Sequence, residues 1–188
     1  MIAYVYLESL KFVDTWVNGG SLPIRSVLEY KCKEEGREGN LTPDEGVIDT
    51  STHAQNLFGI SAEDSSITIG KFLVAGKVVA SNIKIERFSE TGIVLCAAAR
   101  LDRKIAEGFK RNYCVRINDF DSLKSVIDTQ LGVVGKLGYC YYTTGHKRNT
   151  FLKSYKDSWQ NEIRIFWKDL SPTEVILPKG LAIQIDVP

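Results

Sequence analysis

The sequence has few of the residues on which metal sites and disulfide frameworks depend. Its 188 residues include two histidines and four cysteines, and Cys32, Cys96, Cys114 and Cys140 form no Cys-x-x-Cys pair. This spacing argues against a zinc site and against a disulfide scaffold, so we expect no metal cofactor. Three of the cysteines lie in apolar runs, where a thiol acts as a small core side chain. A reducing compartment is the simplest expectation.

The chain also lacks an excess of either charge and any long apolar run. It has 24 basic and 23 acidic residues, for a formal charge of +1, so net charge alone does not favour a polyanionic partner. No apolar run approaches the roughly 20 residues of a transmembrane helix. The N-terminus meets Glu8 without a preceding basic segment, unlike a signal peptide. We therefore expect a soluble, cytoplasmic protein that does not bind membranes.

The familiar motifs of nucleotide-binding and hydrolytic enzymes are missing as well. The sequence contains no Walker motif and no Gly-x-Gly-x-x-Gly loop. Neither a Gly-x-Ser-x-Gly motif nor a reactive cysteine accompanies the two histidines, His53 and His146. A metal-dependent nuclease using paired carboxylates remains an alternative, although nine of the 23 acidic residues lie in one polar segment and not on adjacent strand ends.

Charge is unevenly distributed along the chain. Between Glu29 and Asp64, nine acidic residues stand against three basic ones, without a sustained apolar period. A segment of this length, about 30–64, is typical of a surface excursion, and a lid over a site is one interpretation. Its Thr42 to Glu45 part could instead begin a short helix. Between Lys136 and Lys168, seven bases stand against two acids, which indicates either a solvated face or a surface for phosphates or nucleic acid.

Short strands and helices follow one another in mixed order. Residues 93–98 are apolar throughout, as expected of a central strand. Ala75-Gly76-Lys77 indicates a hairpin turn, and Asp119 is placed to cap a helix. About nine strands and three or four helices predict a single α+β domain over residues 1–188, with mixed and mostly antiparallel sheets.

The most informative stretch begins at Trp159. As a strand, it places Gln160, Glu162 and Arg164 on one face and apolar side chains on the other. An amide and a carboxylate two positions apart could bind sugar hydroxyls and stabilise the oxocarbenium-like charge that develops when NAD loses nicotinamide. The alternative is the solvated face of an ordinary sheet, with Glu162 and Arg164 as a surface ion pair worth about 0–1 kcal/mol.

Two other segments could reach the same groove. Tyr4 and Tyr6 on the first strand are able to stack on nicotinamide. A predicted turn from Arg87 to Gly92 carries Ser89. For Ser89 the alternative interpretation is a simple turn after a strand.

These segments resemble a known family. Arg87-Phe88-Ser89-Glu90, the later Lys153, and Trp159 to Arg164 resemble, in the same order over residues 83–168, a widespread bacterial family of unknown function found around prophages and defence islands. The chain departs from that family where Ala97-Ala98-Ala99 replaces the expected Trp and Tyr.

The opening strand, the helix and Gly19-Gly20, together with Gln160 and Glu162, are also similar to the NAD-dependent ADP-ribosyltransferase superfamily. The resemblance implies an ADP-ribosyltransferase-like fold and a transferase that uses NAD to modify a protein or nucleic-acid acceptor, in a prophage, toxin or phage-defence setting. It implies that Glu162 stabilises the ribosyl cation, that Ser89 orients ribose or nicotinamide, and that Gln160 positions the acceptor. The residues expected to contact NAD are Tyr4, Tyr6, Arg87, Lys153 and Arg164.

A second hypothesis comes from a different functional class. In it the same fold is a non-catalytic binding or regulatory module, whose basic aromatic surface at 136–168 binds nucleic acid or a partner protein. The aromatic residues are also compatible with a homodimer.

Overall fold

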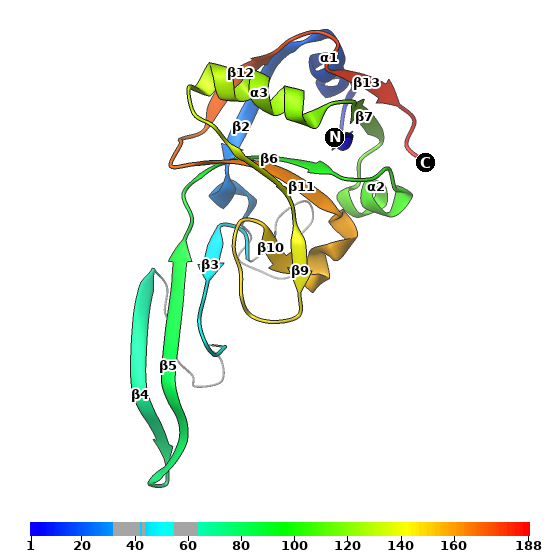
Figure 1. Ribbon diagram of the computed structural model, residues 1–188. Coiled ribbons are helices and arrows are strands. Elements are labelled where there is room, and N and C mark those ends of the chain that lie inside the picture. The colour runs from blue at the N-terminus through cyan, green and yellow to red at the C-terminus, as the bar shows by residue number, and fades with distance from the viewer. Residues whose placement is uncertain (32–41, 43, 55–63) are drawn as a thin grey trace.

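A body of sheet and helices and a long hairpin arm make up the computed structural model, which describes residues 1–31, 42, 44–54 and 64–188 (Figure 1). It is a mixed α+β fold with mostly antiparallel sheets, which confirms the predicted class. In the described part of the chain, no helix has the length and apolar character needed to cross a membrane.

The body is organised around β6 (Gly92–Ala98), the apolar strand predicted to be central. β11 (Glu162–Lys168) pairs with the whole of one edge of β6 and carries β8 (Lys136–Tyr139) on its own far side. The main path of the sheet runs β12-β2-β6-β1-β7-β13. The other strands on this path are β1 (Ala3–Leu7), β2 (Gly20–Ser26), β7 (Tyr113–Ile117), β12 (Thr173–Leu177) and β13 (Ala182–Ile185).

β1 and β2 share the second edge of β6 and diverge from each other. β2 pairs with β6 at Ile93 and Val94, whereas β1 pairs with it only at Ala98. Within the described part of the chain, the three residues between these points, 95–97, have no strand on that edge. The sheet therefore splits beside the middle of β6, and the split leaves room for a cavity.

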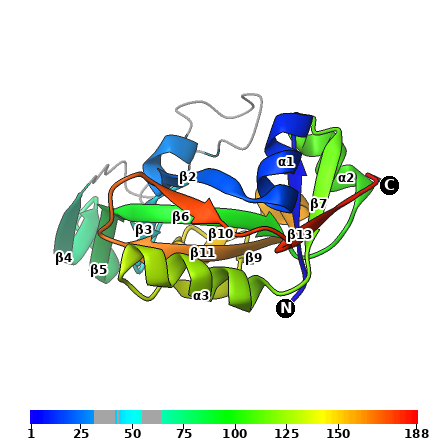
Figure 2. The ribbon, with the colours of Figure 1, turned by 90° about the horizontal axis from the view of Figure 1, so that it is seen from above.

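Three α-helices pack around this sheet in the view from above (Figure 2). α1 (Leu10–Asn18) and α3 (Phe120–Leu131) bury apolar side chains in the main core with β6 and β11. α3 begins where predicted, because the Asp119 side chain accepts hydrogen bonds from the backbone N–H groups of Asp121 and Ser122. α2 (Arg103–Phe109) packs near the segment that precedes β11, with the Phe109 and Trp159 ring centroids 4.8 Å apart.

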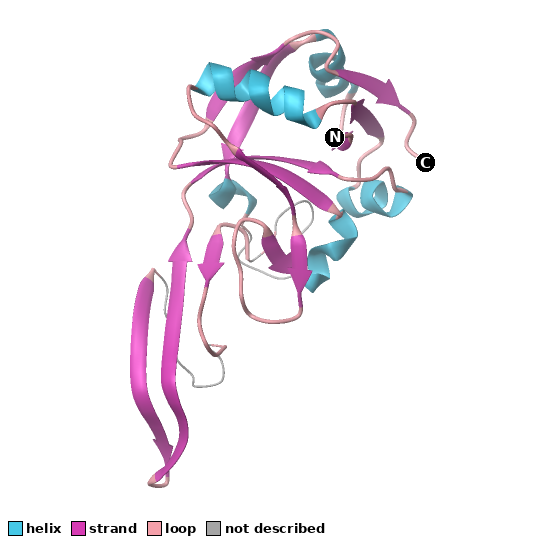
Figure 3. Cartoon of the chain, viewed as in Figure 1, coloured by secondary structure: helices cyan, strands magenta, loops and turns pink. Residues whose placement is uncertain are grey.

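The arm is a two-stranded ribbon that projects away from the body (Figures 1 and 3). β4 (Ser65–Val74) and β5 (Lys77–Ser89) pair along their length, and β3 (Val47–Asp49) adds a short third strand at the base. The predicted turn is confirmed at Ala75 and Gly76, which both have positive φ, as a tight turn between twisted strands requires.

Some predicted local structures are wrong. Trp159 and Gln160 belong to a 3-10 helix, η3 (Tyr155–Gln160), and not to the strand. The Ser154 hydroxyl caps this helix and Asn161 ends it in the left-handed region, so β11 begins only at Glu162. Arg87 and Ser89 also lie within β5 and not in a turn.

The acidic excursion at 30–64 lies partly outside the described residues, including most of the proposed lid. Residues 44–46 form a turn that leads into β3, in place of a helix beginning at Thr42. The backbone N–H of Val47 donates to the Asp44 carbonyl at 3.3 Å within this turn.

Candidate functional site

Arg164 lies at the centre of a buried charge network. It stands opposite Cys96 of β6 and Gly138 of β8, so β11 is covered on both edges. Glu162 and Arg164 share a face, as predicted, but that face is not solvated: their exposed fractions are 7% and 2%. The surface ion pair of the alternative interpretation is thus wrong. Arg164 Nε donates to Glu162 Oε1 at 2.7 Å inside the protein.

Glu45, in the turn before β3, completes the set of acceptors around Arg164. Arg164 Nη1 and Nη2 donate to the two carboxylate oxygens of Glu45, at 2.6 and 2.8 Å, and form a bidentate pair. Nη1 also donates to the Thr150 carbonyl at 2.9 Å, and Nη2 to Glu162 Oε2 at 3.2 Å. Since a guanidinium has five N–H groups, every donor of Arg164 has an acceptor.

Lys153 bridges the same two carboxylates. It lies on β10 (Leu152–Ser154), which pairs in parallel with β9 (Tyr141–Thr143). Its ammonium donates to Gln160 Oε1 and to Glu162 Oε2, both at 2.9 Å, and lies 3.4 Å from Glu45 Oε2. Two of its three N–H groups therefore donate hydrogen bonds, and the contact with Glu45 is an ion pair. Two bases and two acids balance, so the cluster carries no net charge.

The network keeps its acids and bases ionised. Burial alone would raise the pKa of Glu162, but the charges of Arg164 and Lys153 outweigh it and lower that pKa to about 2. The pKa of Glu45 is lowered for the same reason. Burial would lower the pKa of Lys153, yet the Glu162 and Glu45 carboxylates raise it. Glu162 is therefore an anion at neutral pH.

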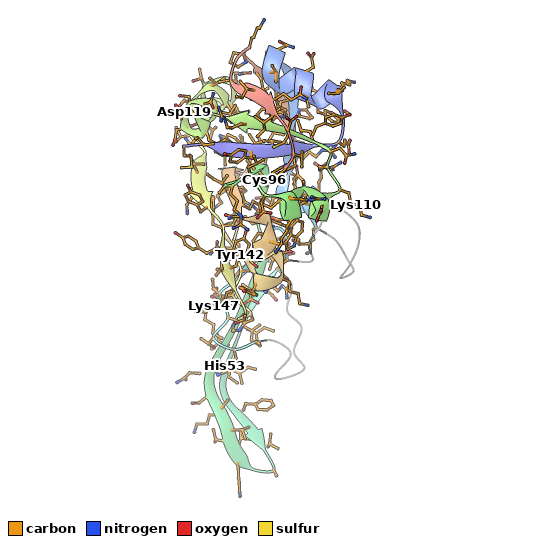
Figure 4. All side chains as sticks on the ribbon, turned by 90° about the vertical axis from the view of Figure 1, so that its right-hand side faces the viewer. His53, Cys96, Lys110, Asp119, Tyr142 and Lys147 are labelled. Atoms are coloured by element: carbon orange, nitrogen blue, oxygen red, sulfur yellow. The ribbon has the colours of Figure 1, made fainter. Side chains whose placement is uncertain are left out.

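A cavity of about 210 Å³ opens beside the network, at the split in the sheet. β6 contributes its residues 95–98 to one wall, and β1 and β2 contribute the other. Tyr30 and Phe109 add aromatic surface. The polar floor consists of Glu45, Lys153, Gln160, Glu162 and Arg164. Cys96 lines this cavity, and Figure 4 shows it in the body, with Tyr142 closer to the arm.

The floor offers hydrogen-bond acceptors and few donors. Glu162 accepts three N–H bonds out of about four that a carboxylate can accept. The Cys96 thiol also hydrogen-bonds to Glu162. This bond lowers the pKa of Glu162, but less than Arg164 and Lys153 do, because a thiol is a weak donor. All five donors of Arg164 and two of the three donors of Lys153 are already used. The site therefore suits a ligand hydroxyl, whereas a phosphate there would have to break the network.

An open groove of about 600 Å³ lies next to the cavity and shares lining residues with it. Both are lined by Tyr6, Leu7, Trp16, Leu22 and Pro23. The groove adds the cations Lys11, Arg25 and Arg111 and the carboxylates Glu8 and Glu174. Arg25 is exposed and pairs with Glu29 at 3.4 Å, a contact worth little at a surface. A ligand longer than the cavity would thus emerge beside these cations.

The structure unites most of the residues predicted for the site. Gln160, Glu162, Lys153 and Arg164 meet in one network, and Tyr4 and Tyr6 line the cavity. The Tyr6 hydroxyl also connects β1 to the start of α2, because it accepts a hydrogen bond from the Asp102 N–H at 2.7 Å. Gln160 joins through η3, although its predicted strand position was wrong.

Ser89 and Arg87 are not brought to this cavity. Both are on β5 at the base of the arm, where the Ser89 N–H donates to Asp64 Oδ1 at 2.6 Å. They line a small separate hollow with Lys31 and Val47. In this structure neither side chain contacts the charge network.

The bases of 136–168 do not form one surface. Lys153 and Arg164 are buried, and Arg148 donates to Asp44 at 2.6 Å. Lys136 lies 5.0 Å from the Phe151 ring centroid, and with Lys168 it lines another groove that also contains Glu90.

Sequence reasoning missed three residues of the site. Glu45 is one of nine acidic residues in its segment, and nothing in the sequence singles it out. Cys96 could have been found from the pairing of β6 with β11, which places it opposite Arg164. Tyr142 fixes the start of β11, since its hydroxyl accepts from the Glu162 N–H at 2.9 Å.

Among the described residues there is no group of three or more His, Cys, Asp or Glu that could hold a metal ion. Comparison with protein families, with curated proteins and with solved structures finds no match to this chain.

Proposed function

We propose that the protein is an NAD-dependent ADP-ribosyltransferase whose cavity takes the nicotinamide-ribosyl half of NAD. The observation that carries this proposal is the position of Glu162: an ionised carboxylate with only the weak Cys96 thiol donor at its fourth acceptor position, buried at the floor of a cavity with aromatic walls. Ribose hydroxyls would donate to Glu162, and Tyr4 or Tyr30 would pack on the flat nicotinamide ring.

The chemistry is transfer of a ribosyl group. The bond between the anomeric carbon of ribose and the nicotinamide nitrogen breaks, and its electron pair leaves with nicotinamide. Positive charge then develops on the ribose, where the Glu162 carboxylate stabilises it. A nucleophilic oxygen or nitrogen of the acceptor forms the new bond and loses its proton to solvent or to a nearby base. No oxidant or reductant is needed.

Size and charge determine where the rest of NAD would lie. The cavity, at about 210 Å³, is too small for a whole dinucleotide, but it shares five lining residues with the outer groove. The pyrophosphate would lie there, near Arg25 and Lys11. This assignment differs from the sequence-based expectation that Lys153 and Arg164 bind NAD, because their donors are occupied by Glu45, Glu162, Gln160 and Thr150. They act as positioning residues for Glu162.

The alternative of a nucleic-acid-binding module has less support. A basic surface needs exposed and clustered cations, and the bases of 136–168 are partly buried and divided among separate contacts. For this reason we propose the transferase first.

Binding and catalysis are tested together with a charge-balanced variant. We expect millimolar NAD to raise the melting temperature of the wild type, and nicotinamide to appear on incubation. In the double variant Lys153→Met/Glu162→Gln, the Arg164–Glu45 pair remains and the net charge is unchanged, so we expect a folded protein without nicotinamide release. The double variant Arg103→Met/Glu107→Gln removes an exposed pair and should behave as the wild type. Absence of both a shift and nicotinamide release in the wild type would contradict the proposal.

A further inference from the structure

The arm has an edge that is open to another strand. β4 is ten residues long, and in the described part of the chain its only strand neighbour is β5. Its residues have no positive φ, and the left-handed residues Asp64 and Ala75 lie immediately outside it. Lys71 is its one charged residue. A long edge of this kind, without proline and with a single charge, is a template for strand pairing.

The other edge of the arm is less suited to pairing. β3 covers the base of β5, and Thr50 and Thr52 donate backbone hydrogen bonds to Glu86 and Lys84 beyond it. Nearer the tip, Asn82 has a φ of 54°, which interrupts the extended backbone. The structure therefore distinguishes β4 as the open edge.

The tip of the arm also exposes apolar surface. Four aliphatic residues at the tip are each more than half exposed: Leu73, Val74, Val78 and Val79. Such a cluster on a projecting element marks an interaction surface. Between Ser65 and Ile85 the arm has three lysines and no acidic residue, so every ionised side chain of the distal arm is a cation.

We infer that β4 pairs antiparallel with β4 of a second copy of this chain, about a two-fold axis at Thr68. In this register Thr68 faces its own copy, and Ile67 of each chain faces Ile69 of the other. Ile67 and Ile69 pair within the arm with Ile85 and Ile83, which are fully buried. The joint therefore extends an existing apolar row from one arm into the other.

Charge also fits this register. Lys71 of each copy would face Ser65 of the other, so the single charge of the strand does not meet a like charge across the joint. If the register shifted by one residue, the isoleucines of the two copies would lie on opposite faces of the joined sheet. A second arm is also of matching length, which an unrelated short peptide is not. The paired region would cover residues 65–71 of both copies.

Charges placed at the two-fold axis test this inference. Sedimentation velocity of the wild type at rising concentration should approach twice the chain mass of 21.1 kDa. Thr68 is exposed, so Thr68→Asp and Thr68→Lys should fold; each should be monomeric, because like charges would face each other. An equimolar mixture of the two variants should recover the dimer, since opposite charges then meet. Ser81→Asp, at an exposed position of β5, should remain dimeric.

Two results would overturn the inference. One is a wild type that keeps a single chain mass up to its solubility limit. The other is a wild-type dimer that Thr68→Asp and Thr68→Lys leave intact, since that dimer would use another surface. The test does not depend on the proposed enzymatic activity, because it measures mass alone.

Discussion

Replacing Arg164 by Met is expected to lower the free energy of unfolding by about 3–5 kcal/mol. The substitution leaves the carboxylates of Glu45 and Glu162 buried with Lys153 as their one remaining cation, and removes four hydrogen bonds that these carboxylates accept. Domains are stable by only about 5–15 kcal/mol, so the loss is a large part of the total. Urea unfolding at neutral pH, followed by far-UV circular dichroism, measures it.

Two further variants isolate the cause. Arg103 is 72% exposed and pairs with Glu107 on α2, so Arg103→Met should change the stability by less than about 0.5 kcal/mol. Arg164→Lys keeps the charge but cannot form the bidentate pair with Glu45, so its stability should fall between those of the wild type and Arg164→Met. If Arg164→Met were no less stable than Arg103→Met, the buried network would not contribute as the structure implies.

Acid is expected to remove about 3 kcal/mol of stability through Glu162 alone. The folded protein lowers the pKa of this residue to about 2, because Arg164 and Lys153 favour its ionised form over the effect of burial. A depressed pKa contributes stability that is fully present above the unfolded pKa of about 4.3 and is lost as pH falls towards 2. The pKa of Glu45 is also lowered, so its protonation in acid removes further stability. Urea midpoints measured at intervals between pH 7 and pH 2 should therefore fall mainly below pH 5.

Other acids with a lowered pKa, such as Asp119 and Asp128, contribute to the same decline, so the comparison has to be made between variants. The double variant Lys153→Met/Glu162→Gln has no carboxylate at position 162, and its stability should decline less between pH 5 and pH 2. Equal declines in the two proteins would show that Glu162 is not held in its ionised form by the network.

Local chemistry made several elements predictable. The apolar run of β6, the Ala75-Gly76 turn and the Asp119 cap depend on neighbouring residues, and each is confirmed. The helix η3 was not predicted, since the hydrophobic alternation that begins at Trp159 conceals a Ser154 cap and a left-handed Asn161. Short-range alternation and capping compete there, and capping prevails.

The site was predictable to the extent that it lies on one strand. Alternation along β11 is sufficient to put Glu162 and Arg164 on a shared face. The burial of that face depends on β8, on β9 and β10, and on the turn that carries Glu45, which are brought in by pairings between distant segments. The divergence of β1 and β2 is likewise a property of the whole sheet, so the cavity could not be foreseen from any one segment.

The contact between Glu45 and Arg164 joins residues 119 positions apart. Closing so long a loop is slow, and the carboxylate of Glu45 stays hydrated until its partner arrives. During synthesis β1, β2, β6 and β7 all leave the ribosome before β11, and the four charges can come together only after β11 has emerged. We therefore expect the floor of the cavity to be among the last parts of the molecule to form, and a chaperone acting on the nascent chain would encounter β6 with its β11 edge still unpaired.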